Sequence, residues 1–186
     1  MYGLVNRAVQ DLVQTRFGDD AWENIKRRAG IDVTVFLSMQ TYDDSITYAL
    51  VEAAVAELGA SAEAVLESFG EYWVDYAARH GYRPMMCVKG QSLFGFIARL
   101  DDLHARLSLS FPELNPPSFR TVREADDTLR LHYYSSRRGL APMVTGLIRG
   151  LGKLFEVDVS VTHDRRRGEE FDHDEFSVVC PAERSS

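Results

Sequence analysis

Residues 112–137, PELNPPSFRTVREADDTLRLHYYSSR, decide the fold of this chain. The paired prolines at 116 and 117 cannot continue a helix, so the loop they form is the clearest boundary in the sequence. After them polar and apolar residues alternate with a period of two. This alternation predicts a hairpin with strands at 119–123 and 128–136 around a turn at 124–127.

Before the proline pair, apolar residues recur with the period of a helix. We expect helices over 2–16, 20–28 and 92–110. Two more lie between them. One is capped by Asp44 or Ser45 and ends at Leu58, and the other is capped by Ser61 and ends at His80–Gly81.

After the hairpin, Pro142 suits the first turn of a helix that reaches Phe155, and two more alternating segments follow near 157–161 and 176–180. The predicted fold class is therefore α+β, with a helical N-terminal lobe packed on a C-terminal antiparallel sheet that has one inserted helix. We expect a single domain over 1–186, with lobes of roughly 1–64 and 65–186.

Composition narrows the possible functions. The chain has 186 residues and a formal net charge of −7, which argues against a nucleic-acid binder. No apolar run approaches the roughly 18 to 20 residues of a membrane span, and the first residues lack the features of a signal peptide, so we expect a cytoplasmic protein. The two cysteines, Cys87 and Cys180, form no CxxC pair, which excludes a disulfide scaffold and covalent CxxCH haem attachment.

His104 is the most informative histidine. It lies four residues after Leu100 and three before Leu107, which places it on the apolar stripe of its helix. A buried imidazole needs a partner for its nitrogens. That partner is either a backbone carbonyl, as in an ordinary core histidine, or a metal such as haem iron.

Tyr133, Ser135 and Arg137 follow one another at every second position of a predicted strand, so we expect them on one face. Two hydroxyls and a guanidinium suit a carboxylate or a phosphate. The alternative is a solvated strand face with a partly buried tyrosine. A planar, apolar, iron-bearing ligand with two carboxylates would satisfy both this set and His104.

The sequence resembles the haem nitric oxide/oxygen binding family, H-NOX, and in particular its bacterial stand-alone members and the N-terminal domain of the soluble guanylate cyclase beta subunit. The resemblance covers nearly the whole chain, and the segments that carry it are 1–6 (MYGLVN), 42–45 (YDDS), 100–104 (LDDLH), 117–120 (PSFR) and 131–137 (LHYYSSR).

The resemblance implies a b-type haem held without covalent attachment. His104 would be the proximal iron ligand, and Tyr133, Ser135 and Arg137 would bind the haem propionates. Pro117 matches the proline that presses on the porphyrin, although taken alone it is simply a loop proline.

The resemblance also places the gas-binding side. Oxygen-binding members have a tyrosine donor on the helix after the Y-x-S-x-R motif, and Met143 stands at that position here. A pocket lined by Val5, Val9, Met143 and Leu147 would favour nitric oxide and carbon monoxide over oxygen. Trp73 is the exception to an apolar pocket, since its indole N–H either faces the ligand or is part of ordinary core packing.

The function implied is a non-catalytic gas sensor, in which nitric oxide weakens or breaks the bond from iron to His104 and a separate signalling protein, such as a histidine kinase or a diguanylate cyclase, reads the change. Two other classes remain open. One is a non-haem protein-interaction module of the same fold, with His104 in the core. The other is a haem enzyme, which the lack of distal acid–base groups disfavours.

Overall fold

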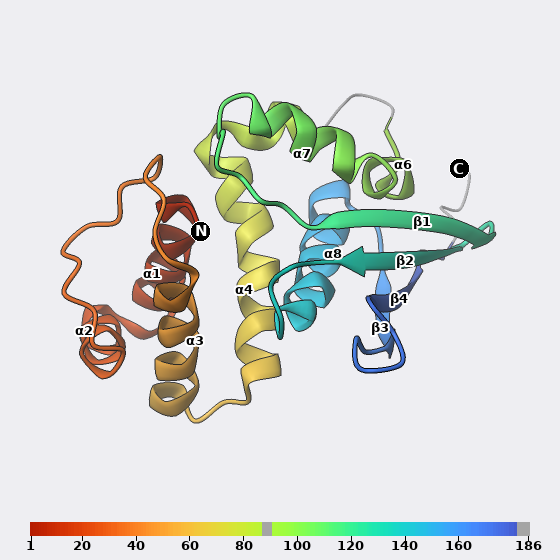
Figure 1. Cartoon of the computed structure of the whole chain (residues 1–186). Coiled ribbons are helices and arrows are strands. Elements are labelled where there is room, and N and C mark those ends of the chain that lie inside the picture. The colour runs from red at the N-terminus through yellow and green to blue at the C-terminus, as the bar shows by residue number, and fades with distance from the viewer. Residues whose placement is uncertain (87–90, 182–186) are drawn as a thin grey trace.

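The computed structural model describes residues 1–86 and 91–181, so Cys87 lies outside the described residues. Helices occupy the chain before the proline pair, and strands enter only after it (Figure 1). The elements in chain order are α1 (Gly3–Phe17), α2 (Asp19–Arg28), α3 (Asp44–Leu58), α4 (Ala62–Ala77), η1 (Ala78–Tyr82), α5 (Arg83–Met86), α6 (Leu93–Ile97), α7 (Leu100–Ser108), β1 (Ser118–Ala125), β2 (Thr128–Tyr134), α8 (Ala141–Phe155), β3 (Ser160–Arg165) and β4 (Asp174–Val179). The α+β class predicted from the sequence is confirmed. No described helix combines the length and the apolar character needed to cross a membrane.

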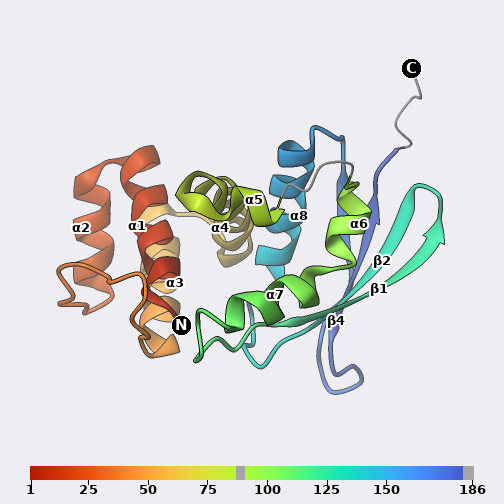
Figure 2. The same ribbon diagram turned by 90° about the horizontal axis from the view of Figure 1, so that it is seen from above.

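Helix α4 stands between α1–α3 on one side and α8 with the sheet on the other (Figures 1 and 2). It contributes to both hydrophobic clusters of the described residues. Its Phe69 and Tyr76 pack with α1, α2 and α3, whereas its Val74 and Ala77 pack with α8 and the sheet. The division into lobes near residue 64 therefore stays a prediction, because α4 belongs to both cores.

Two glycines bring α4 and α8 into close contact. A Cβ atom on Gly146 of α8 would lie 1.9 Å from the carbonyl oxygen of Glu67, and one on Gly70 of α4 would lie 2.1 Å from that of Met143. Only residues without a side chain fit these positions, since any Cβ would overlap the facing backbone. The pair fixes α8 against α4 at the point where both helices border the cavity described below.

The four strands form an antiparallel sheet in the order β1-β2-β4-β3. Leu129, Leu131 and Phe176 are buried on one face, and Figure 2 shows α6, α7 and α8 all on the same side of the strands. Residues alternate between faces along a strand, so His132 lies on the opposite face from Tyr133. The sheet thus presents one face to the helical core and one face away from it.

Several predicted boundaries are wrong in detail. Asp43, rather than Asp44 or Ser45, caps α3, because its carboxylate accepts from the backbone N–H of Ser45 at 2.8 Å. Ser61 caps α4 as expected, with its hydroxyl accepting from Ala64 N. The helix that begins after Ser61 was expected to end at His80–Gly81. The backbone turns at this point, with Gly81 at φ 96°, and continues into the short helix α5.

The single helix predicted over 92–110 is two helices. Ser92 caps α6, which ends at Ile97, and α7 begins after Arg99, whose φ of −114° and ψ of 18° are not helical. The amphipathic pattern runs through the break without a glycine or proline, so periodicity alone does not reveal it. After the break, α7 carries His104, which lines a cavity.

Candidate functional site

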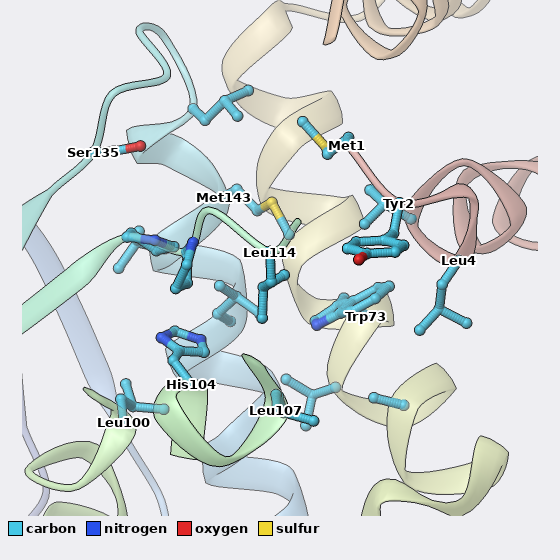
Figure 3. Close-up of a pocket in the computed structure, with 18 of the residues that line it drawn as sticks. Met1, Tyr2, Leu4, Trp73, Leu100, His104, Leu107, Leu114, Ser135 and Met143 are labelled. Carbon is cyan, nitrogen blue, oxygen red and sulfur yellow. The ribbon is translucent and has the colours of Figure 1, made fainter. Parts of the chain in front are cut away.

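A cavity of about 340 Å³ lies among α1, α4, α7, α8 and the start of the sheet (Figure 3). Its volume falls in the range of about 300–1,000 Å³ typical of cofactor sites. Every site residue predicted from the sequence lines this cavity: Val5, Val9, Trp73, His104, Pro117, Tyr133, Ser135, Arg137, Met143 and Leu147.

His104 points from α7 into the cavity (Figure 3). It is half-buried, not fully buried as the stripe predicted, since α7 borders an open space instead of a packed core. Its Nδ1 is shielded from solvent and has no hydrogen-bond partner among the described residues. Burial lowers the pKa of His104, with Asp101 and the Pro117 carbonyl opposing the shift, so the imidazole is neutral at pH 7 and has a lone pair available for a metal.

The position of His104 relative to the sheet is set by Asp101, one turn earlier on α7. Its two carboxylate oxygens accept from the Ser118 hydroxyl at 2.7 Å and from the Phe119 backbone N–H at 2.8 Å. These bonds join α7 to the first residues of β1, directly after Pro117. The imidazole of His104 and the ring of Pro117 are therefore positioned by the same junction.

Tyr133, Ser135 and Arg137 meet at one edge of the cavity, although they do not share a strand face. Strand β2 ends at Tyr134, so Ser135 and Arg137 lie in the loop that leads to α8. The Ser135 hydroxyl accepts from the Arg137 backbone N–H at 3.1 Å, which tightens this loop. Burial raises the pKa of Tyr133, and its phenol therefore stays protonated and able to donate.

The guanidinium of Arg137 is held from the side by Asp44. Its Nε donates to Asp44 Oδ2 at 2.7 Å and its Nη2 to Oδ1 at 3.4 Å, while Nη1 donates to the Asn115 carbonyl at 2.6 Å. The N-terminal ammonium of Met1 donates to the same Asp44 carboxylate at 2.7 Å. An arginine has five N–H donors, so these three contacts leave two for a further carboxylate.

The wall opposite His104 is apolar. Figure 3 shows Met143 and His104 on opposite sides of the cavity. Among the described lining residues from α1, α4 and α8, Trp73 is the one with a side-chain N–H or O–H. Its ring packs on Phe69 and Tyr76, and its indole nitrogen is turned toward the cavity in Figure 3, without a hydrogen bond to any described residue.

These features fit a haem. Apolar side chains form both walls, as a porphyrin ring requires, and one neutral imidazole with an unpartnered nitrogen lies on one wall only. The donors of Tyr133, Ser135 and Arg137 gather at a single edge, where the carboxylates of a haem would emerge. A porphyrin held in this way would receive one protein ligand and leave the other face of its iron open.

Sequence reasoning missed three residues that organise the site: Asp44, Asp101 and Asn115. Asp44 was considered as a helix cap, and both Asp44 and Asp101 lie in segments that carry the resemblance, but neither was given a role at the site. Asp44 and Arg137 are 93 positions apart, and no local pattern connects them. The available signal was the unusual density of acidic residues next to otherwise apolar segments, at 43–44 and 101–102.

Comparisons with known proteins agree on the family. The model of the haem-NO-binding family matches residues 2–163. The chain is 31% identical over 187 residues to the soluble guanylate cyclase gcy-37 of Caenorhabditis elegans, covering 96% of this chain and 26% of the cyclase. It is 40% identical over 128 residues to the guanylate cyclase soluble subunit beta-2 of Rattus norvegicus, covering 66% of this chain and 19% of that subunit.

Solved structures show the same fold. An H-NOX protein from S. oneidensis in the Fe(II)NO ligation state superposes with a TM-score of 0.87 at 18% identity, over 98% of this chain and 100% of that one. An H-NOX mutant from K. algicida in the Fe(II) unliganded state gives a TM-score of 0.85, over 99% of this chain and 98% of that one, also at 18% identity. The chain spans between about a fifth and a quarter of the length of these two cyclases. The match over residues 2–163 and the shared fold show that the chain belongs to the haem-NO-binding, or H-NOX, family of haem-based gas sensors.

Proposed function

We propose that this chain is a cytoplasmic sensor of nitric oxide and carbon monoxide that excludes oxygen and signals to a separate protein. A b-type haem would be held by His104 and by the donors at the propionate edge, Tyr133, Ser135 and Arg137. The haem supplies an iron atom that binds the gas, and its bond to His104 is the link that nitric oxide weakens. The observation that carries the proposal is a single imidazole, that of His104, whose buried Nδ1 has no hydrogen-bond partner among the described residues and which faces an apolar wall across one cavity.

The apolar wall supports the choice of gas. Bound oxygen carries partial negative charge and is stabilised by a nearby donor, whereas nitric oxide and carbon monoxide depend little on one. Val5, Val9, Met143 and Leu147 offer no N–H or O–H group to such a ligand. The side chains on this wall therefore bind a neutral diatomic gas by contact alone.

The attachment of α7 supports the signalling step. Because Asp101 ties α7 to the first residues of β1, a release of His104 would act on α7 and on the junction after Pro117 together. We propose that two arrangements of the N-terminal helices against the sheet then differ in population, and a gas shifts them only by its different affinity for each. The reader would be a separate signalling protein such as a histidine kinase or a diguanylate cyclase.

The test is the absorption spectrum of the purified, haem-loaded protein in the ferrous state. We expect a strong Soret band that shifts to a five-coordinate form with nitric oxide, changes with carbon monoxide and stays unchanged in air. A colourless protein that takes up no added haemin would replace the proposal with the non-haem interaction module.

One observation favours a second candidate, an oxygen-binding sensor. The indole N–H of Trp73 faces the cavity without a partner and is the one side-chain donor among the described lining residues of α1, α4 and α8. We expect Trp73→Phe to leave the spectra in nitric oxide, carbon monoxide and air unchanged. A stable oxygen complex in the unmodified protein that Trp73→Phe abolishes would establish the second candidate instead.

A further inference from the structure

Two histidines and a glutamate meet on the face of the sheet that points away from the haem cavity. His132 is on β2, Glu175 is its register partner on β4, and His173 directly precedes β4. Their ligand atoms all lie within 4.8 Å of one another, and the side chains are only 22%, 12% and 15% exposed for His132, Glu175 and His173. Neither the haem cavity nor the proposed gas response uses any of these residues.

The three ligand atoms form a small triangle. Nδ1 of His132 lies 2.9 Å from Nε2 of His173, and Oε1 of Glu175 lies 3.6 Å and 3.4 Å from these two nitrogens. A tetrahedral zinc ion with bonds of about 2.0–2.1 Å separates its ligand atoms by about 3.3 Å. Two of the three edges match this spacing, and the third requires the histidine rings to part by a few tenths of an ångström.

A carboxylate already orients one of the rings. Asp172 Oδ1 lies 2.6 Å from Nδ1 of His173, and the two groups are hydrogen-bonded. A proton on Nδ1 leaves Nε2 of His173 with a lone pair directed at His132 and Glu175. A histidine held by a carboxylate on its far nitrogen is the usual arrangement of a metal-binding imidazole.

We propose that His132, His173 and Glu175 bind a divalent transition-metal ion of the zinc type, at a site separate from the haem. Two imidazoles and one carboxylate form a ligand set that zinc and its neighbours accept with further positions open to water. Without metal, His132 Nδ1–H donates to His173 Nε2. On binding, the His132 proton moves to Nε2 of the same ring, so that Nδ1 becomes a ligand and no proton is released.

Arg165 and Tyr134 are the neighbours that adjust the site. Nη1 of Arg165 lies 3.6 Å from Glu175 Oε1 and competes with a cation for that oxygen. Its side chain is 55% exposed and is therefore able to move into solvent when a metal binds. The ring of Tyr134 stacks on His173 at 4.4 Å between centroids and restricts the rotation of that imidazole.

The experiment is equilibrium dialysis of the haem-loaded protein, prepared without a histidine tag, against micromolar Zn²⁺, followed by metal analysis of zinc and iron in the same sample. We expect one zinc per chain in addition to the haem iron. His132→Ala and Glu175→Gln should each weaken zinc binding at least about tenfold, and Asp172→Asn, which removes only the orienting carboxylate, by about tenfold.

His163→Gln is the matched control. This histidine belongs to the same sheet, but it pairs with Phe176 on the opposite face and bonds Asp174 there. It should bind zinc like the unmodified protein. Equal zinc content in the unmodified protein and in His132→Ala and Asp172→Asn would overturn the proposal and leave the cluster as a hydrogen-bonded network. Asp172 is 84% exposed, so its variant keeps the fold even if the other two lose stability.

Discussion

The ion pair between Asp44 and Arg137 gives a sharp test of how the chain would hold a haem. Asp44 accepts from Nε and Nη2 of Arg137 and the Asn115 carbonyl accepts from Nη1, so these contacts leave two N–H donors of a guanidinium that lines the cavity. Replacing Asp44 by Asn keeps the shape and removes the charge. Arg137 then loses its ion pair and one of the two oxygens of residue 44 that accept from it, and keeps only the Asn115 carbonyl as an unchanged partner, so we expect the haem to dissociate faster.

The magnitude follows from the exposure of the pair. Arg137 is 18% exposed and Asp44 36%, so solvent screens the attraction in part. A bidentate pair of this kind contributes about 1 kcal/mol, the upper end of the range for exposed pairs. Because about 1.4 kcal/mol corresponds to a factor of ten, Asp44→Asn should speed haem dissociation about fivefold.

The assay is stopped-flow transfer of haem to excess apomyoglobin for Asp44→Asn, Arg137→Ala and the double variant. In the Arg137→Ala background the Asp44 change should have no further effect, since the partner is gone. Glu57→Gln is the control, because Glu57 pairs with Arg28 at 3.3 Å on α2, away from the haem cavity. An unchanged rate in Asp44→Asn, or an equal effect with and without Arg137, would refute the assignment.

The Asp44–Arg137 pair also predicts that the folded protein loses stability at low pH. Partial burial acts to raise the pKa of Asp44, but the hydrogen bonds from Arg137 and the N-terminus outweigh it and lower the pKa below 3.8. The unfolded chain therefore binds this proton more readily than the folded one. The stabilisation is fully present above about pH 4 and is lost as the pH falls through the folded pKa, and Asp44→Asn should flatten this part of a stability profile measured by urea unfolding.

Three further changes test the site and the packing around it. His104→Gly should lose axial ligation and regain it with imidazole in the medium; a ferrous spectrum identical to that of the unmodified protein would show that His104 is not the ligand. Met143→Tyr places a hydroxyl on the apolar wall and should produce an oxygen complex in air, visible in the ferrous spectrum; an unchanged spectrum would mean that position 143 does not face the bound gas. Gly146→Ala forces a Cβ to within 1.9 Å of the Glu67 carbonyl, so α8 must shift, and we expect a loss of about 1–3 kcal/mol in unfolding free energy. Gly168→Ala, with nothing within 4 Å of its Cβ, should change that free energy by less than about 0.5 kcal/mol, and equal losses in both would refute the close approach.

Elements with a strong apolar period were predictable from the sequence, and so was the hairpin after the proline pair. The helix caps depend on which of several adjacent acceptors reaches the backbone, so Asp43 was not distinguished from Asp44. The break at Arg99 was also beyond prediction, because α6 and α7 continue one amphipathic pattern and their packing alone separates them. Local periodicity reports which side of an element is apolar, not where tertiary contacts bend the chain.

The residues of the cavity also show that local sequence patterns do not report tertiary contacts. The spacing of Tyr133, Ser135 and Arg137 predicted a common strand face, but two of them lie beyond the strand and reach the cavity because the loop turns back toward α8. Contacts such as Asp44 with Arg137 link residues that only the complete fold brings together. Such contacts are not predictable from the sequence, because a long-range ion pair leaves no local pattern.

The placement of these long-range contacts bears on how a signal would leave the cavity. The N-terminal segment is joined to the rim of the cavity through polar bonds: Tyr2 Oη accepts from Glu113 N at 3.1 Å, Thr41 donates to Glu113 Oε2 at 3.0 Å, and Tyr48 donates to the Arg138 carbonyl at 2.9 Å. Each is worth about 1 kcal/mol net. By contrast, Val74 of α4 packs with Val144 and Ile148 of α8 in one hydrophobic cluster, so separating these two helices would expose buried apolar surface. A few kcal/mol released at the cavity would therefore displace α1–α3 against the sheet before it separated α4 from α8. The Asp44–Arg137 pair is one of the contacts between α1–α3 and the rim of the cavity that such a displacement would change.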